Sequence, residues 1–371
     1  MHVIKPLAFV FIVLNKIYLF TYFENTDVFL FYSNIQRMKH QVIGQGTYGC
    51  IHNKSLLCQN TDINKNSNYV SKVMLKRYGN DEIEINKIID NIDKDNLFHL
   101  GMSKECKIQD SVSNRRAINL CKKSKYIDSK IITNNALLLM KHGGINLDAF
   151  ACKLRKINAR DSSVQLMKNF WIEAYRLLLG VEMFQRKDFI HHDIKPQNIV
   201  FDEKEMRLNY IDFGLSGSIE EIINKCKKSR NSKGGQWWSY PPEYRYINKM
   251  DFDRRKNESI CSILQSTHVT GFLPYIVNNK DFYKHDLEWL SNFGYKDYNK
   301  LLDKCMKTFD SYCVGFTLLL ILDSGRHLMD PYLWKDLNEL LYSAITPRYM
   351  DRIEINTLLS RYKEVIKKHN L

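Results

Sequence analysis

Four polar residues lie within one short segment, 189–214, of the chain: Asp193, Lys195, Asn198 and Asp212. Between the last two of them, two apolar runs flank a charged turn, a pattern typical of two strands joined by a tight connection. Such strands would bring both ends of the segment side by side. A carboxylate that accepts a hydroxyl proton, an ammonium that neutralises phosphate, and an amide with a second carboxylate that hold Mg²⁺ suit phosphoryl transfer. The segment therefore predicts a phosphoryl-transfer site.

The same segment resembles the catalytic loop and the metal-binding motif of eukaryotic-type protein kinases. The family pattern is H-R-D-x-K-x-x-N followed by D-F-G, and this chain has HHDIKPQN and then IDFG. His192 stands where the family has arginine. Either motif alone would fit polar turns at strand ends, but Asp212 follows Asn198 by 14 positions, in the family's order. The resemblance implies that Asp193 orients and deprotonates the substrate hydroxyl and that Lys195 neutralises the γ-phosphate. It assigns Mg²⁺ to Asn198 and Asp212.

A glycine-rich stretch, GQGTYGC, fits the pattern G-x-G-x-x-G, which Rossmann folds share. A dinucleotide fingerprint opens a helix, whereas Cys50 and Ile51 lead into an extended polar stretch. The stretch therefore resembles the loop that kinases fold over ATP, because glycines let backbone N–H groups approach phosphates closely. The resemblance assigns ATP contacts to the following residues: Gly44, Gln45, Gly46, Gly49 and Ile51.

The next predicted strand, 68–75, carries Lys72 inside its apolar pattern. It resembles the V-A-I-K strand of kinases, whose lysine contacts the α- and β-phosphates; a surface lysine on an edge strand is the alternative. Apolar residues in 81–92 follow a helical period, and a glutamate on this helix should hold Lys72. Glu82 is our first choice because it shares the apolar face of the helix, and Glu84 is the second.

Three further segments belong to the predicted framework of the site. Residues 136–140 predict a buried strand that ends at a glycine-containing break, which resembles the kinase hinge; Met140 is the hinge residue assigned to ATP. The residues between the predicted helix and this strand, 97–133, are predicted to form strands and loops. Apolar residues in 164–185 follow the spacing of one buried helical face, so we predict a core helix that leads to the catalytic loop.

The segment after the D-F-G motif, 215–240, resembles a kinase activation segment. It ends in Pro-Pro-Glu243, a variant of A-P-E, and the resemblance implies a buried ion pair between Glu243 and Arg352. A neutral imidazole at His192 offers little charge for an activation-loop phosphate, so we do not expect phosphorylation control. Serines that could be phosphorylated are Ser216, Ser218, Ser229, Ser232 and Ser239.

The sequence DSYCVG resembles the D-x-x-x-x-G motif that begins the central helix of the kinase helical lobe. Its aspartate, Asp310, should bond the backbone of the catalytic loop. It comes 67 positions after Glu243, many more than is typical, so we predict an insert at about 244–309 with helices of its own. This insert and the glycine-rich stretch resemble the divergent kinases of large DNA viruses.

Composition limits the classes of partner. Lys and Arg total 55 against 41 Asp and Glu, which gives a net charge of +14. The basic residues are dispersed without a nucleic-acid motif, so we expect no specific nucleic-acid partner, and acidic protein substrates would suit the charge. The chain has nine cysteines, never spaced as C-x-x-C, which predicts neither disulfides nor a zinc site and indicates a reducing compartment. We expect a cytoplasmic protein, in the host cytoplasm or the virion if it is viral.

Residues 1–37 differ from the rest of the chain. Two apolar runs are separated by Asn15 and Lys16, and a charge near the centre of a membrane-spanning helix is costly. The segment is therefore either a dispensable extension upstream of Met38, which we favour, or a membrane anchor.

The resemblance as a whole implies an α+β, bilobal protein kinase fold. Residues 38–140 would form a small β-rich N-lobe and residues 141–371 a larger helical C-lobe. The implied activity is transfer of the γ-phosphoryl group of ATP, with Mg²⁺, to serine or threonine of a protein substrate, by a monomer; dual specificity stays open. The alternatives are an ATP-binding pseudokinase scaffold and a kinase-like phosphotransferase for small molecules.

Overall fold

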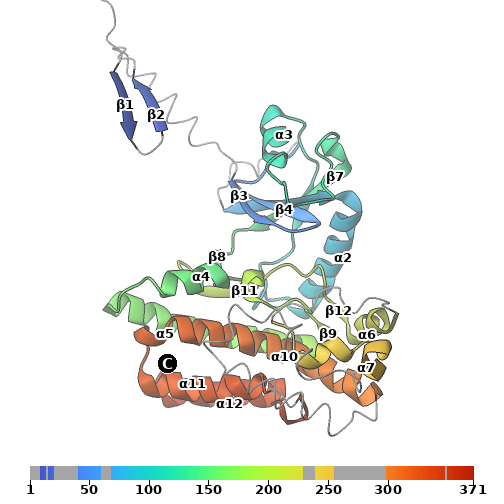
Figure 1. Ribbon diagram of the computed structural model, residues 1–371, viewed down its shortest axis with the longest axis vertical. Coiled ribbons are helices and arrows are strands. Elements are labelled where there is room, and N and C mark those ends of the chain that lie inside the picture. The colour runs from blue at the N-terminus through green and yellow to red at the C-terminus, as the bar shows by residue number, and fades with distance from the viewer. Residues whose placement is uncertain are drawn as a thin grey trace, which may run out of the picture.

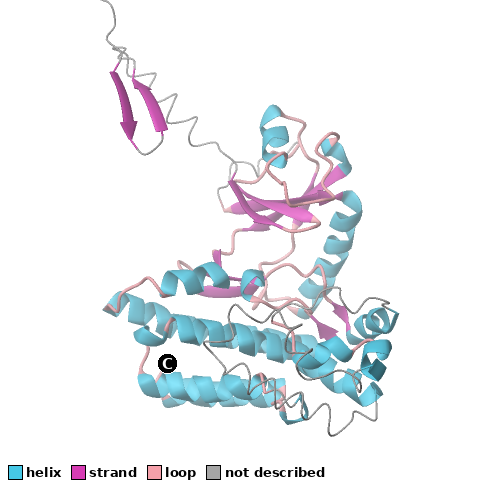
Figure 2. Ribbon diagram, viewed as in Figure 1, coloured by secondary structure: helices cyan, strands magenta, loops and turns pink. Residues whose placement is uncertain are grey.

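The computed structural model shows a β-rich part stacked on a larger helical part (Figures 1 and 2). This is the mixed α+β architecture expected from the sequence. The described residues are 9–13, 16–20, 41–59, 68–228, 239–254, 298–346 and 349–371.

The β-rich part is built on a five-stranded antiparallel sheet with the order β3-β4-β5-β7-β6. The central strand β5 is buried along most of its length, as expected for a strand with neighbours on both sides and cover on both faces. The strands are β3 (Gln41–Gln45), β4 (Gly49–Asn53), β5 (Tyr69–Leu75), β6 (Lys104–Cys106) and β7 (Asn135–Lys141).

Helix α2 (Lys76–Ile92) begins directly after β5, without an intervening loop. It packs closely on β7, because a Cβ at Gly79 would lie 2.5 Å from the Cβ of Ala136. The helix was predicted at 81–92, and it starts five residues earlier, at Lys76. This immediate strand-to-helix passage explains why Lys72 and Glu82 are only 10 residues apart.

The segment 97–133 differs from the prediction of strands and loops. Besides the short strand β6 it contains a helix, α3 (Val112–Ile118), whose N-terminus is capped by the Ser111 side chain accepting a hydrogen bond from the backbone N–H of Asn114. Ala117 and Ile118 of this helix pack against Cys50 and Leu137 of the sheet. The helix is too short to show a period in the sequence.

The helical part is organised around α5 (Asp161–Arg186) and α10 (Tyr298–Ser324). The predicted core helix at 164–185 is confirmed by α5, whose apolar face is buried at Met167, Phe170, Trp171, Ala174, Leu177, Leu178, Val181 and Phe184. Helices α11 (Pro331–Ala344) and α12 (Ile355–Lys368) pack below, and α4 (Leu147–Leu154) leads in from the sheet (Figure 1).

Helix α10 is long and apolar enough to cross a membrane, but 94% of its most apolar window is buried inside the protein. It is therefore the central core helix. It starts 12 residues before Asp310, the residue predicted near its beginning. Of the predicted insert at 244–309, the structure describes α7 (Lys249–Arg254) and the first turns of α10, and residues 255–297 lie outside the described part.

Short elements complete the described residues. A hairpin of β1 (Phe9–Val13) and β2 (Lys16–Phe20) lies within the segment 1–37. The others are η2 (Ile132–Asn134), β8 (Ile145–Asn146), β9 (Phe189–Ile190), η3 (Pro196–Asn198), β10 (Ile199–Asp202), β11 (Arg207–Tyr210), β12 (Gly217–Ser218), α6 (Ile219–Lys228), η4 (Pro242–Tyr246), η7 (Arg326–Leu328) and η8 (Tyr349–Asp351).

The prediction of no disulfides is wrong. The β-rich part contains two, Cys50–Cys121 and Cys58–Cys106. The paired cysteines are 71 and 48 residues apart in the sequence, and only the fold of the sheet and α3 brings them together. Spacing along the chain carries no information on such pairs. Among the described cysteines, Cys152, Cys226, Cys305 and Cys313 are free thiols.

Candidate active site

The hairpin of β10 and β11 places the two ends of the polar segment next to each other, as predicted. Ile199 pairs with Tyr210, and the backbone N–H of Ile211 donates a 3.0 Å hydrogen bond to the carbonyl oxygen of Asn198. Asn198 and Asp212 therefore flank the open end of the hairpin.

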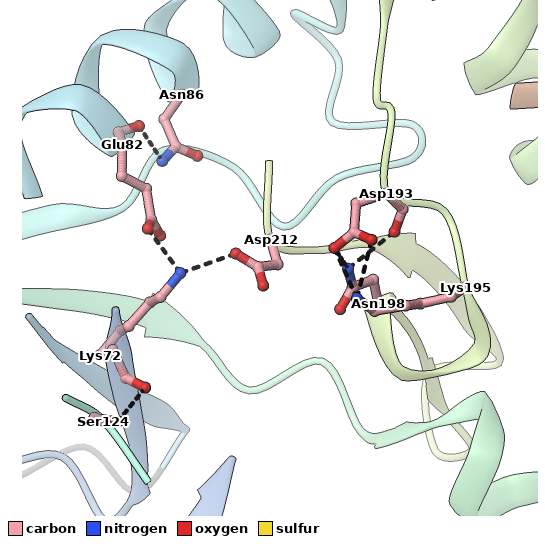
Figure 3. A network of polar contacts seen from close by, with 9 residues as sticks. Lys72, Glu82, Asn86, Ser124, Asp193, Lys195, Asn198 and Asp212 are labelled. Atoms are coloured by element: carbon pink, nitrogen blue, oxygen red, sulfur yellow. Dashed lines mark hydrogen bonds and ion pairs between the residues drawn. The ribbon is translucent and has the colours of Figure 1, made fainter. Parts of the chain in front are cut away.

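Asp193 is held by the two polar residues that follow it (Figure 3). The Lys195 ammonium lies 2.9 and 2.8 Å from its two carboxylate oxygens. The Asn198 amide donates to Oδ2 of Asp193 at 2.7 Å and to its backbone carbonyl at 2.9 Å. Burial raises the pKa of Asp193, and Lys195 opposes that rise. The result is a fixed, partly desolvated carboxylate, as a general base requires.

Lys72 joins the sheet to the hairpin. Its Nζ lies 2.7 Å from Oε2 of Glu82 and 3.0 Å from Oδ1 of Asp212 (Figure 3). Burial alone would lower the pKa of Lys72, but the carboxylates of Asp212 and Glu82 raise it overall, so the ammonium is charged. The same contact lowers the pKa of Asp212, whose side chain is 47% exposed. A charged lysine and an accessible carboxylate thus meet at one point.

The choice between the two candidate glutamates is decided by geometry. Glu82 is buried on the face of α2 toward Lys72, and burial raises its pKa against the effect of the ammonium. Glu84 is exposed and pairs with Lys87 at 2.7 Å along the same helix. The ion pair of Lys72 with Glu82 is therefore the one present, in agreement with the shared helical face seen in the sequence.

The glycine-rich loop forms the turn between β3 and β4. Gly46 N donates to Gly49 O at 2.9 Å, and a Cβ at Gly49 would come within 3.2 Å of the Lys72 Cε, so glycine lets the loop pass close to the lysine. Ile51 is paired with Lys72 across β4 and β5. The Gln45 side chain is bonded to residues 120 and 123, so only its backbone is left for the ATP contact that the resemblance assigned to it.

The predicted hinge follows β7. Met140, partly buried, is paired with Val70 near the end of that strand. Gly144 has a φ of +91°, and a Cβ there would lie 2.0 Å from the carbonyl oxygen of Phe201. Only glycine therefore fits this turn, which leads into β8 and its pairing with β10. The turn thus connects the sheet to a strand that pairs with the catalytic hairpin.

A comparison with known families decides which family the chain belongs to. Residues 37–254, more than half of the chain, match the family model described as the protein kinase domain. The chain belongs to the protein kinase family. ATP and a divalent metal ion are what protein kinases use in general.

Curated relatives of this kinase are similar over limited segments. The kinase is 26% identical over 150 residues to serine/threonine-protein kinase TOUSLED of Arabidopsis thaliana, 40% of this chain and 20% of the relative. It is 28% identical over 113 residues to CBL-interacting serine/threonine-protein kinase 10 of the same plant, 29% of this chain and 22% of the relative. It is 33% identical over 76 residues to serine/threonine-protein kinase STE11 of Saccharomyces cerevisiae, 20% of this chain and 10% of the relative. The chain thus matches less than a quarter of the length of each of these relatives.

Asp310 of helix α10 fixes the catalytic loop of the kinase by hydrogen bonds to its backbone. Both oxygens of Asp310 accept backbone N–H groups, from His191 at 2.7 Å and from His192 at 3.1 Å, as predicted. Burial raises the pKa of Asp310 to about 7, and these two hydrogen bonds oppose the rise. The predicted pair of Arg352 with Glu243 is also present, at 2.6 and 3.2 Å, with both side chains fully buried.

His192 occupies an aromatic site that the sequence did not reveal. Its Nε2 lies 2.9 Å from the Tyr244 hydroxyl, and the Tyr240 hydroxyl donates to its backbone carbonyl at 2.9 Å. Burial lowers the pKa of His192 to about 4, so the ring is neutral at pH 7. The two tyrosines and Phe309 pack around the imidazole. A hydrogen-bonded aromatic cluster therefore stands where most kinases have an arginine that binds phosphate.

Proposed function

We propose that this kinase is catalytically active and transfers the γ-phosphoryl group of ATP to serine or threonine hydroxyls of proteins. The observation that carries the proposal is the Lys72 ammonium, placed between Glu82 and Asp212, with Asp193 nearby in the loop that precedes the hairpin (Figure 3). The polar residues that phosphoryl transfer needs are present, and they converge from the sheet, α2 and the hairpin.

The residues fit a magnesium ion and a triphosphate. The half-exposed carboxylate of Asp212 and the amide oxygen of Asn198 are hard oxygen donors, which Mg²⁺ prefers. Bound there, the metal ion would neutralise charge on the β- and γ-phosphates. Lys72 would hold the α- and β-phosphates, and the glycine-rich loop would cover them with backbone N–H groups.

Asp193 would orient the substrate hydroxyl and accept its proton, since its carboxylate is fixed and its pKa is raised by burial. Lys195, already 2.8 Å from that carboxylate, would neutralise charge on the transferred group. Serine/threonine specificity is supported by the D-I-K-P-Q-N sequence and by the names of the relatives. Protein substrates are supported by the family, and acidic ones by the net charge of +14.

The test is radiolabel transfer from [γ-³²P]ATP to a basic and to an acidic protein, followed by phosphoamino-acid analysis. We expect Asp193→Asn to lower the rate by about 10²–10⁴-fold, the usual contribution of a general base. Asp303→Asn, at an exposed surface pair on α10, is the matched control and should retain the wild-type rate. Mg·ATP binding without transfer in the wild type would instead support a pseudokinase scaffold.

A further inference from the structure

The outer side of the glycine-rich loop is covered by residues 120–126, which we call the strap. The Ser124 hydroxyl lies 2.8 Å from the carbonyl oxygens of both Gly46 and Gly49, and so bridges the two ends of the turn. The backbone N–H of Lys125 donates to the carbonyl of Thr47 at 3.1 Å. Three carbonyls of the loop are thereby turned toward the strap.

Two side chains of the loop also bind the strap. Gln45 accepts from the backbone N–H of Lys123 at 3.0 Å and donates to the carbonyl of Leu120 at 3.3 Å. The ring of Tyr48 stacks on Tyr126, with centroids 5.5 Å apart and an interplanar angle of 10°. Each residue of the loop from 45 to 49 therefore has a partner in the strap.

The strap is fixed to the loop by a covalent bond. Cys121 forms a disulfide with Cys50, which follows directly on Gly49, and their Cα atoms are 5.8 Å apart. On its N-terminal side the strap follows α3, where Ala117 and Ile118 are buried in one apolar cluster with Cys50 and Leu137 of the sheet. The loop is thus linked to a buried part of the N-lobe.

The orientation of the loop carbonyls has a consequence for phosphate binding. In a trans peptide the C=O of one residue and the N–H of the next point in opposite directions. With the carbonyls of Gly46 and Thr47 directed to the strap, the N–H groups of Thr47 and Tyr48 point away from it. Donors on that side suit the phosphates of a nucleotide, whereas inward carbonyls would repel them.

We propose that the strap is a positioning element for the nucleotide, anchored by Ser124 and by the Cys50–Cys121 disulfide, and that reducing this disulfide weakens nucleotide binding. The proposal rests on the proposed ATP site. Ser124 acts through the loop backbone, so it is a positioning residue. Loss of either anchor lets the loop sample other conformations, and ordering it again on binding costs free energy.

The chemistry of reduction is a thiol–disulfide exchange with a dithiol. A thiolate of the reagent attacks the Cys121 sulfur, because Cys121 retains 7% exposure and Cys50 has none. The Cys50 sulfur leaves as a thiolate and takes up a proton from solvent. The second thiol of the reagent then displaces Cys121 and closes a cyclic disulfide. The dithiol is oxidised by two electrons, and the two cysteines end as thiols.

The experiment compares Mg·ADP affinity by calorimetry, and KM for ATP and kcat, in the oxidised and the dithiol-reduced full chain. We expect Ser124→Ala to raise Kd and KM by about three- to tenfold, the loss of one or two hydrogen bonds, with kcat nearly unchanged. Ser124→Thr keeps the hydroxyl and should retain wild-type affinity. Cys121→Ser should behave, when oxidised, like the reduced wild type.

The second disulfide gives the matched control. A variant with Cys58→Ser and Cys106→Ser lacks a bridge of the same lobe that does not touch the loop, and it should keep the full redox dependence. Unchanged affinity in both Ser124→Ala and the reduced wild type would overturn the proposal, as would an effect on kcat alone. A wild type that binds no Mg·ADP in either redox state would contradict the proposed function itself, so the two failures are distinguishable.

Discussion

The ammonium of Lys72 lies 3.0 Å from a carboxylate oxygen of Asp212, although the two residues are 140 positions apart in the sequence. Lys72 belongs to the central strand of the sheet, and Asp212 follows the catalytic hairpin. Asp212 also adopts a φ of +62°, an uncommon conformation for a residue other than glycine that is frequent at functional sites. One ion pair therefore fixes the sheet against the helical part at the point where chemistry is expected.

Replacing Glu82 tests whether this arrangement matters for catalysis. Glu82→Gln keeps the size of the side chain but removes the charge that holds Lys72 at 2.7 Å. A hydrogen bond between charged groups contributes about 1.5–3 kcal/mol, so kcat/KM for ATP should fall roughly 10- to 100-fold. Steady-state kinetics measure this. Glu84→Gln, on the exposed side of the same helix, is the control and should change kcat/KM by less than about twofold.

The buried pair of Arg352 and Glu243 should be essential for stability. Arg352→Met leaves the Glu243 carboxylate buried without its partner, which costs about 3–5 kcal/mol in the free energy of unfolding. Urea denaturation followed by circular dichroism measures the loss. Combining it with Glu243→Leu should recover part of the stability, because no unpaired charge remains.

A surface pair provides the comparison for that measurement. Lys335 and Glu339 lie 3.9 Å apart, with both side chains about two-thirds exposed. Lys335→Ala should lower the free energy of unfolding by less than about 0.5 kcal/mol. If Arg352→Met were as mild as Lys335→Ala, the pair would not brace the lobe.

His192 should make the protein less stable in acid. Burial lowers its pKa from 6.5 to about 4, so between these pH values the unfolded chain binds a proton that the folded protein excludes. The free energy of unfolding therefore falls as the pH drops from 6.5 to 4, by at most about 1.36 kcal/mol per pH unit from this group. His191, with a pKa also near 4, adds to the slope.

Comparison of wild type with His192→Gln isolates the contribution of that imidazole. Asp310, whose pKa is raised to about 7, has the opposite pH dependence between 3.8 and 7, but it is present in both proteins. The variant should show a shallower loss of stability between pH 6.5 and 4 in urea titrations. Identical slopes would mean that the pKa of His192 is the same in the folded and the unfolded protein, so that folding does not keep the imidazole from taking up a proton and pairing with a phosphate.

The Cys58–Cys106 disulfide should stabilise the N-lobe. It joins residues 48 positions apart, and removing a bridge of this kind lowers the free energy of unfolding by about 2–4 kcal/mol. Urea denaturation of Cys58→Ser combined with Cys106→Ser, without reductant, checks this value. Adding a dithiol to the wild type should lower stability at least as much, because both bridges are then lost. A wild type that is indifferent to the dithiol would show that neither bridge forms in solution.

Much of the fold followed from local patterns. The helix at 164–185 has apolar residues at every turn of one face, and two apolar runs flank the charged turn of the catalytic hairpin. The pairing of Glu82 with Lys72 followed from its position on the apolar face of α2. Asp310 and Arg352 were found because their neighbours resemble family motifs, and their contacts are present in the structure.

Other features depend on contacts between distant segments and have no local signal. The two disulfides join cysteines that the sheet and α3 bring together, and Ser124 reaches the glycine-rich loop across 75 to 78 residues. Tyr244 binds His192 from 52 residues away. Residues 255–297 lie outside the described part, so the predicted helices there stay a prediction. The location of the protein, its monomeric state and the likeness to viral kinases also stay predictions.

The most direct test of the account is a calorimetric titration of the full chain with ATP, with and without Mg²⁺. Because Lys72, Asn198 and Asp212 would hold one magnesium–triphosphate, Mg²⁺ should tighten ATP binding at least about tenfold in the wild type, a coupling of about 1.4 kcal/mol. Asp212→Asn should abolish that dependence while the protein stays folded. ATP binding that is equally tight without Mg²⁺, or that keeps its Mg²⁺ dependence in Asp212→Asn, would contradict the assignment of this site.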